Sequence, residues 1–273
     1  MNHQSHTKTN DFEGYSPFDM HEILYDTFGE NSPIEILKMD ESEYLKVPIL
    51  NQLKYLLMLI EKKGTLKLTA KGYLPTGIVA DIYSQGYLKD KMIERGISKL
   101  YKETDSNSIN LTRILLELSG LIKKRANKLS LTHKGITLIT DDAKLLQLIF
   151  KIFTTKFNWG YYDGYSEDNV GQLGFGFSLI LLSQYGKQKR ADEFYAKKYF
   201  KAFTQLVDNA SPPNYGTLEE QLESCYSLRT FDRFLIYFGL INIESAENIL
   251  GNSKIIKTDL YDKLIRCKPP KYS

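Results

Sequence analysis

The chain has 273 residues, of which 42% are hydrophobic and 25% charged, and its formal net charge is +3. These values are ordinary for a globular protein of one large or two modest domains, and the chain lacks the run of about 20 apolar residues that spans a bilayer. Its polar first residues, MNHQSHTKTNDFEG, do not resemble a secretory signal, so we expect a cytoplasmic protein that does not bind a membrane. Cys225 and Cys267 lie far apart in the sequence, so we expect them to be reduced.

The charge is unevenly distributed along the chain. Residues 1–43 contain ten acidic residues against Lys8 and Lys38, which gives −8 and leaves +11 for residues 44–273. An acidic N-terminal segment before a basic remainder is typical of two arrangements: a solvated acidic leader, or an acidic arm that packs on the basic part of the chain. We favour the solvated leader. We expect residues 1–16 to be disordered, and the imbalance predicts that residues 17–47 pack on the basic part of the chain.

Helical periodicity dominates the first half of the chain. Short helices are predicted over 17–28 and 32–39, the second with Ser32 as its cap and Pro33 in its first turn. A longer helix over 49–64 has its leucines on one face and ends at Gly64. After a short strand and turn over 65–75, further helices are predicted over 76–86, 90–103, 105–120 and from about 141 onward.

The second half begins with a Gly- and Tyr-rich loop over 157–176, where we place a domain boundary. Helices are predicted beyond the loop over 177–186, 189–207, 217–226 and 227–239. A short strand then leads into a last helix within 254–265.

One layout recurs at 58–72, 115–135 and 234–260: an apolar helix, a glycine, a strand, a polar connection, and then Leu or Ile one or two residues before Thr. The glycine supplies the left-handed residue beyond the helix end, and the strands on either side of the polar connection can pair as a hairpin. The threonine can cap the next helix. The pattern therefore predicts the same hairpin up to three times, with strands near 121–123 and 129–131 in the second copy. The glycines are Gly64, Gly120 and Gly239, and the threonines are Thr69, Thr132 and Thr258.

This layout resembles winged-helix domains, in which a helix, Gly-Leu-Ile, a hairpin "wing" and Leu-Thr-x-x-Gly follow one another. The match is closest from Gly120 to Gly135, covers much of the first half of the chain, and extends more loosely to its last part. The resemblance implies tandem winged-helix-like modules. The stretches LKLTAKGYLP (66–75) and SLILLSQYGKQKRADEFYAKKYF (178–200) are also similar to uncharacterised bacterial proteins grouped with a plasmid open reading frame of the pRiA4b type, which implies no activity.

Residues 120–135, GLIKKRANKLSLTHKG, are called the basic hairpin below; they contain five Lys or Arg residues and no acidic residue. Such a hairpin can lie along a phosphate backbone or in a minor groove, although ordinary hairpins also carry lysines for solubility. The preceding helix is expected to present Thr112, Arg113, Leu116 and Glu117, which is a poor set for reading bases. The candidate nucleic-acid-binding residues are Arg113, Lys123, Lys124, Arg125, Lys128 and Lys134.

Two other segments carry charge in a pattern that could bind a partner. Residues 187–201 contain six basic residues interleaved with tyrosines, a pattern that suits binding of single-stranded nucleic acid. However, Tyr195 and Tyr199 lie on the helix face that is expected to pack into the core. The third copy of the layout has an acidic connection and a helix expected to present Arg229, Thr230 and Arg233. We favour a packed helix with a solvated lysine face for the first segment and protein contact for the second.

The sequence offers little for catalysis. GFGFS (174–178) lacks the third glycine and the βαβ context of a nucleotide-binding fingerprint, and the histidines have no partner at metal-ligand spacing. The loop 159–168, with Asp163, Glu167 and Asp168 among aromatic residues, suits a ligand cleft or a packed loop, and we favour the loop. We therefore expect no catalytic residues, no metal and no cofactor, and we lean against an enzyme.

Together these observations predict a mainly α protein with short β-hairpins, an α+β fold built from tandem winged-helix-like modules. The expected parts are an acidic, partly disordered segment (1–47), a winged-helix-like domain (48–156), and a helical domain ending in a second such module (157–273). The predicted function is that of a nucleic-acid-associated, non-enzymatic protein, linked to transcription or a mobile element, with double-stranded DNA as partner. The alternative is a protein-interaction scaffold that does not bind nucleic acid.

Overall fold

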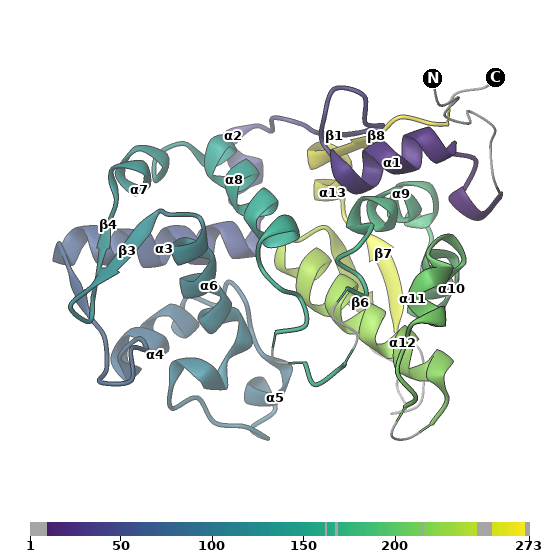
Figure 1. Ribbon diagram of the computed structural model, residues 1–273. Coiled ribbons are helices and arrows are strands. Elements are labelled where there is room, and N and C mark those ends of the chain that lie inside the picture. The colour runs from purple at the N-terminus through teal and green to yellow at the C-terminus, as the bar shows by residue number, and fades with distance from the viewer. Residues whose placement is uncertain (1–9, 162, 167–168, 214–215, 245–252, 271–273) are drawn as a thin grey trace. The chain divides into compact units, whose positions relative to one another are not determined.

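The computed structural model describes all residues except 1–9, 162, 167–168, 214–215, 245–252 and 271–273. The chain forms two compact units: unit 1 contains residues 1–38 and 158–273, and unit 2 contains residues 39–157. Helices with small antiparallel sheets make up both units (Figure 1), as predicted for an α+β fold. The first 38 residues belong to the same unit as the C-terminal half, whereas we expected a separate segment over 1–47. Among the described residues, no helix combines the length and the apolar character that a bilayer crossing requires.

Unit 2 packs its helices around α3, whose Leu50, Leu53, Leu57 and Ile60 are completely buried, as the spacing in the sequence predicts. Gly64 ends α3 with φ +68°, in the left-handed region. The elements of unit 2, in chain order, are α2 (Glu41–Tyr44), α3 (Pro48–Lys63), β2 (Leu66–Lys67), α4 (Thr76–Ser84), α5 (Lys91–Glu94), the 3₁₀ turn η2 (Glu103–Asp105), α6 (Asn107–Leu118), β3 (Ile122–Arg125), β4 (Lys128–Leu131), α7 (His133–Leu138) and α8 (Asp142–Thr155).

Unit 1 has α9 at its centre, a helix that is apolar on all sides and buried over Phe175–Leu182. Its remaining elements precede α9 in the N-terminal segment or follow it to the C-terminus. They are the 3₁₀ turn η1 (Asn10–Phe12), α1 (Pro17–Tyr25), β1 (Ile34–Ile36), α9 (Phe175–Tyr185), β5 (Arg190–Ala191), α10 (Asp192–Ala202), α11 (Thr204–Asp208), α12 (Leu218–Ser227), the π-helix η3 (Leu228–Leu235), β6 (Ile241–Glu244), β7 (Lys254–Lys257), α13 (Asp259–Leu264) and β8 (Ile265–Cys267).

The two units share one order of elements: helix, strand, helix, helix, strand, strand. In unit 2 this order is α3, β2, α4, α6, β3, β4, and in unit 1 it is α9, β5, α10, α12, β6, β7. Each three-stranded sheet has the same strand order, first–third–second, written β2-β4-β3 and β5-β7-β6. The repeat is therefore a property of the whole module and not of the hairpins alone.

The expected first copy of the hairpin is wrong. The strand after Gly64 is β2, which pairs with β4 far along the chain (Leu66 with Leu129). Thr69 closes the following turn by accepting a hydrogen bond of 3.1 Å from the Tyr73 amide, and caps no helix. The segment 58–72 is thus the first strand of the unit 2 sheet, and only the second and third copies are hairpins.

One further predicted helix is absent from the structure, and another is reduced to four residues. Residues 34–36 form β1, which pairs with β8 in register Ile34–Cys267, because a tertiary partner is available and isoleucines at alternate positions fit a strand. Residues 90–103 contain only the four-residue α5 and the start of η2. Gly96, with φ +71°, interrupts this segment.

The acidic N-terminal segment docks on basic residues of unit 1, so the solvated leader that we favoured is wrong. Packing was predicted for residues 17–47, which include Glu35, and the docked segment also includes Asp11 and Glu13. Glu13 pairs with Lys198 at 2.7 Å and Asp11 with Lys201 at 3.1 Å, while Glu35 contacts Arg266 and Lys268. The two basic partners hold the pKa of Glu35 below its usual value. We expected disorder over residues 1–16. Residues 1–9 fall outside the described residues, but over 10–16 the expectation is wrong: Asn10–Phe12 form η1, Tyr15 is buried and Ser16 caps α1.

Candidate nucleic-acid interface

The basic hairpin is a regular two-stranded ladder, which confirms the strands predicted near 121–123 and 129–131. β3 and β4 pair antiparallel from Ile122–Leu131 to Arg125–Lys128. Ala126 and Asn127 form the two-residue turn and both have positive φ, +46° and +57°. Two such residues in sequence are the requirement of the type I′ turn that matches the twist of a hairpin.

The tip of the basic hairpin is fixed to the neighbouring strand. The Asn127 side-chain amide donates to the carbonyl oxygens of Thr69 (2.7 Å) and Leu68 (3.3 Å). In return the Leu68 amide donates to the Asn127 carbonyl at 2.9 Å. On the inner face Leu129 and Ile122 are buried. The hairpin is therefore held in one position before any ligand arrives.

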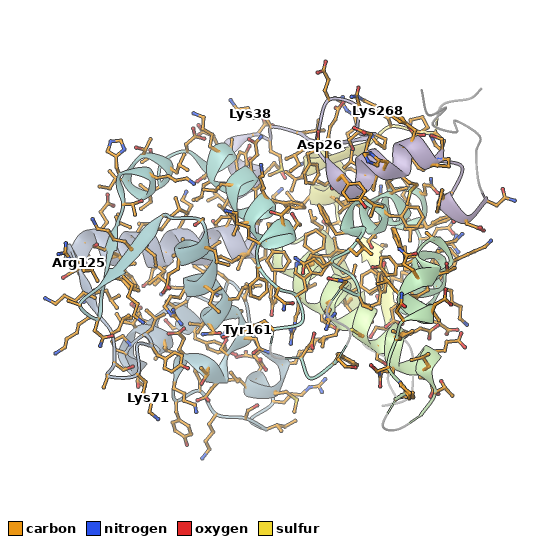
Figure 2. The ribbon with its side chains drawn as sticks, in the orientation of Figure 1. Asp26, Lys38, Lys71, Arg125, Tyr161 and Lys268 are labelled. Atoms are coloured by element: carbon orange, nitrogen blue, oxygen red, sulfur yellow. The ribbon has the colours of Figure 1, made fainter. Side chains whose placement is uncertain are left out.

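A row of three cations crosses the sheet at this tip. Lys67 on β2 stands opposite Lys128 on β4, which stands opposite Arg125 on β3. Directly opposed residues of antiparallel strands point to the same face, and all three side chains are exposed. Figure 2 shows Arg125 and Lys71 pointing away from the body of unit 2.

Within the described part of the chain, these cations have no carboxylate partner. The stretches 62–72 and 119–135 contain no Asp or Glu, and none of Lys67, Arg125 and Lys128 belongs to an ion pair found among the described residues. Like charges that face each other across strands destabilise a sheet. The arrangement therefore favours an anion lying across the row.

The other predicted hairpin residues have more local roles. Lys123 is exposed beside the row. Lys124 reaches the Gly72 carbonyl at 3.5 Å, and Lys134 donates to the Ser119 carbonyl at 2.9 Å, just beyond the C-terminal end of α6. A cation at that place is favourable for the helix dipole, so Lys134 stabilises α6 in addition to any role at the surface.

The outward face predicted for α6 is wrong, and Arg113 is the clearest case. Thr112 and Leu116 are completely buried and Arg113 is only 9% exposed. The Arg113 guanidinium donates to Glu103 and Glu117 at 2.7 and 2.6 Å. Burial alone would lower the pKa of Arg113, but these carboxylates outweigh it and the pKa is raised. A charged residue such as Arg113 is expected to be exposed when only the sequence is considered. In the structure, the buried carboxylate of Glu103 from a preceding segment covers this face of α6.

Glu103 is the residue that closes this face of α6. Its carboxylate is fully buried and accepts hydrogen bonds from the Leu74 amide (2.6 Å), the Asn110 side chain (2.7 Å) and Arg113 Nε (2.7 Å). On another side of α6, Gln52 of α3 donates to Thr112 at 2.8 Å. Helix α6 is therefore an internal element that cannot enter a DNA groove in this conformation.

The second basic segment, 187–201, differs from the hairpin because acids neutralise most of it. Lys189 pairs with Glu244, Lys197 with Glu193, and Lys198 and Lys201 with the N-terminal acids. Tyr195 and Tyr199 are buried in the core of unit 1, as their spacing predicts. This segment is a packed helix with a compensated surface.

The π-helix of unit 1 is also an internal element. Arg229 and Thr230, expected on an outward face, are 1% and 0% exposed. Arg229 Nε donates to Asp163 at 2.6 Å, and neither of these two side chains is exposed to solvent. With Trp159 also buried, this part of the 159–168 loop is packed, while the expectation for Glu167 and Asp168 falls outside the described residues.

Sequence reasoning missed two cations of the candidate interface, Lys67 and Lys71. Lys67 enters the row only because β2 pairs with β4, a long-range pairing that no local pattern specifies. The alternation LKLTAK, with Leu66 and Leu68 inward, did signal that Lys67 lies outward on a strand.

Comparisons with protein-family models, curated proteins and solved structures find no match for this chain.

Proposed function

We propose that this protein binds double-stranded nucleic acid through the basic hairpin of unit 2, by contacts with phosphates and not with base edges. We propose also that both units are winged-helix modules, because each combines the helix–strand–helix–helix–strand–strand order with the first–third–second sheet. The observation that carries the binding proposal is the row Lys67–Lys128–Arg125, which runs from β2 across the hairpin that Asn127 fixes in place.

Protection of sheet edges does not account for this row. Lysines on edge strands prevent aggregation, and that reason would serve Lys67 and Arg125, because β2 and β3 are the outer strands of the sheet. Lys128 lies between them on the central strand β4, where no edge needs protection. Phosphates spaced along a duplex backbone are anions that such a row can contact, with release of counterions.

The burial of α6 supports contacts that are independent of sequence. Specific readout through the major groove needs exposed Arg, Asn or Gln side chains on the inserted helix. On α6 both Asn110 and Arg113 are committed to Glu103. Asn107, at the first position of the helix, is the one exposed residue of these types on α6, which is too few for the paired contacts that specific readout uses. Phosphate contacts by the hairpin are therefore the main source of affinity in this proposal.

The test replaces Lys123, Lys124, Arg125 and Lys128 together by Ala and titrates a random-sequence duplex at several salt concentrations. The four side chains are exposed, so the thermal unfolding temperature should stay close to that of wild type. The affinity should fall for all sequences alike. The salt dependence should flatten by a slope of about 0.9 for each phosphate that the variant no longer neutralises.

A charge-matched comparison keeps the result specific to the hairpin. Arg125→Ala/Lys128→Ala should lower the affinity, whereas Lys151→Ala/Lys156→Ala, which removes the same charge from exposed positions of α8 and its C-cap, should not. Equal affinity and equal salt slope for wild type and the quadruple variant would contradict the proposal.

A protein-binding scaffold is the second candidate, and one feature of unit 1 favours it. A cavity of about 360 Å³ lies among α10, α11 and α12, lined by Phe200, Val207, Leu218 and Leu222 with Lys197 and two glutamates at its rim. An apolar depression with a charged rim is typical of protein contact sites. If the duplex-binding test fails, this candidate becomes the first.

A further inference from the structure

A long connection replaces the short turn between the second and third helices of the unit 2 module. Residues 85–106 join α4 to α6 and contain only α5 and η2. Three of the ten large apolar side chains exposed in the described chain lie here: Met92 (47%), Ile97 (64%) and Tyr101 (63%). This density of exposed apolar surface in one short segment indicates a contact region.

The same segment is basic, and its acids are already engaged. Residues 89–102 contain five basic and two acidic residues. Asp90 accepts from the Met92 and Ile93 amides at the start of α5, and Glu94 accepts from Tyr83 and pairs with Lys89. Arg95 and Lys99 are exposed and have no such partner in the ion pairs found within the described chain.

The segment is anchored at its C-terminal end and is not a loose loop. Asp105 accepts hydrogen bonds of 2.9 Å from the amides of Tyr101 and Lys102, and Glu103 fastens the following turn to α6. These bonds fix the backbone at Tyr101 and over the residues that join it to α6. The connection therefore covers the face of α6 that would otherwise be free.

The connection adjoins the basic hairpin. Lys124 of the hairpin reaches the carbonyl of Gly72, and the amide of Leu74 donates to Glu103 at 2.6 Å. Gly72 and Leu74 are separated by one residue, which spans at most about 7 Å of extended chain. The hairpin and the end of the 91–102 segment are thus neighbouring parts of one unit; in Figure 1, α4 lies between the hairpin and α5.

We propose that residues 91–102 form a second contact with the duplex, in place of α6. Arg95 and Lys99 contact phosphates, and Ile97 and Tyr101 press against the sugars that line a groove. Proteins that bind the minor groove also insert apolar side chains into it and contact the DNA with neighbouring Arg and Lys residues. This inference rests on the proposed function and extends it from one contact to two.

A membrane surface suits the segment less well. Amphipathic helices that bind lipid bury a continuous apolar face over several turns, and α5 has only the four residues Lys91–Glu94. The unpaired cations of the basic hairpin lie on the same unit, and charge complementarity with one extended polyanion unites both regions. The occupant we assign is therefore a nucleic-acid duplex.

The test compares two double variants that separate charge from apolar contact. Arg95→Ala/Lys99→Ala should weaken binding of a random-sequence duplex and flatten its salt dependence by about 0.9 for each phosphate left without its cation. Ile97→Ala/Tyr101→Ala should weaken binding at least about fivefold with an unchanged salt slope. Lys151→Ala/Lys156→Ala is the charge-matched control, and thermal unfolding checks that all variants remain folded.

The outcomes separate this inference from the proposed function. Failure of the wild-type protein to bind the duplex would overturn both. Reduced affinity in the hairpin variant, with wild-type affinity in both 95/99 and 97/101 variants, would overturn only the second contact. Binding of wild type to vesicles of phosphatidylserine and phosphatidylcholine, abolished in the 97/101 variant while duplex binding is retained, would assign the segment to a lipid surface and overturn the inference.

Discussion

Thr132 Oγ1 donates a hydrogen bond of 2.7 Å to the carbonyl oxygen of Gly120, and so ties the end of the basic hairpin to the helix that precedes it. Thr258 and Gly239 form the same 2.7 Å bond in unit 1. Both glycines have positive φ, +70° and +72°. The two threonines differ in one respect. Thr132 Oγ1 also accepts a hydrogen bond from the Gly135 amide and so caps α7, whereas the Thr258 side chain does not cap α13.

This difference predicts unequal effects of the same substitution. Thr132→Ala should lower the free energy of unfolding by about 1 kcal/mol more than Thr258→Ala, because loss of a capping hydroxyl costs about that much. Urea denaturation of both variants measures it. Equal losses would show that the bond to the glycine carbonyl, and not the cap, is the energetically important interaction.

Glu103→Gln should be strongly destabilising. The buried carboxylate accepts from Leu74, Asn110 and Arg113, and the amide would place a donor against these donors while leaving Arg113 with Glu117 alone. Breaking a buried ion pair in this way costs about 3–5 kcal/mol. Chemical denaturation should show this decrease in the free energy of unfolding.

A double-mutant cycle tests whether Arg113 is the partner whose loss destabilises the Glu103→Gln variant. Glu103→Gln combined with Arg113→Met should cost less than the sum of the two single changes, because the unpaired charge is then absent. Additive losses would contradict a direct coupling between Glu103 and Arg113.

Ala126→Gly should stabilise the protein. Ala126 has φ +46°, and left-handed backbone is unfavourable for a residue with a Cβ. After the greater freedom of glycine in the unfolded chain is subtracted, a gain of about 0.5–1 kcal/mol remains. Asn127→Gly is the matched control and should not stabilise, since it removes the amide bonds to Leu68 and Thr69. Thermal unfolding of both variants checks this.

Glu223 gives a prediction for pH. Burial and then the nearby Glu193 raise the pKa of Glu223, so the folded protein holds this proton more tightly than the unfolded chain does. The contribution to stability is present at low pH and is lost as the pH rises through the raised pKa. Glu223→Gln should therefore increase stability at neutral pH, by about 0.5 kcal/mol or less, and the difference from wild type should vanish toward low pH. Urea denaturation of both proteins across this pH range measures the difference, and a gain that persists at low pH would contradict the prediction.

Features set by neighbouring residues were predictable from the sequence. The basic hairpin follows from Gly120, the alternation of Leu129 with Leu131, and the turn at Ala126–Asn127, all within a few positions. The buried face of α3 follows in the same way from leucines at helical spacing. In both cases local preference and long-range packing favour the same structure.

Features created by distant partners were not. Arg113 reads as a surface residue until Glu103 covers it, and residues 34–36 read as a helix until β8 pairs with them. The cation row has the same origin, because about half of unit 2 separates β2 from β4 along the chain. Patterns in a single sequence show polarity and the periodicity of hydrophobic residues. They do not show which distant polar side chains will form a pair.

The pairing of β1 with β8 has a consequence for synthesis on the ribosome. One strand lies at 34–36 and the other at 265–267, so the sheet that closes unit 1 cannot form until both have been translated. Unit 2, residues 39–157, is synthesised in full long before that, and domains generally fold as they emerge. The inserted unit would then be folded while residues 10–38, including buried Tyr15, Met20 and Ile23, still wait for their C-terminal partners. The apolar side chains of this stretch therefore stay exposed for longer during synthesis than those of unit 2.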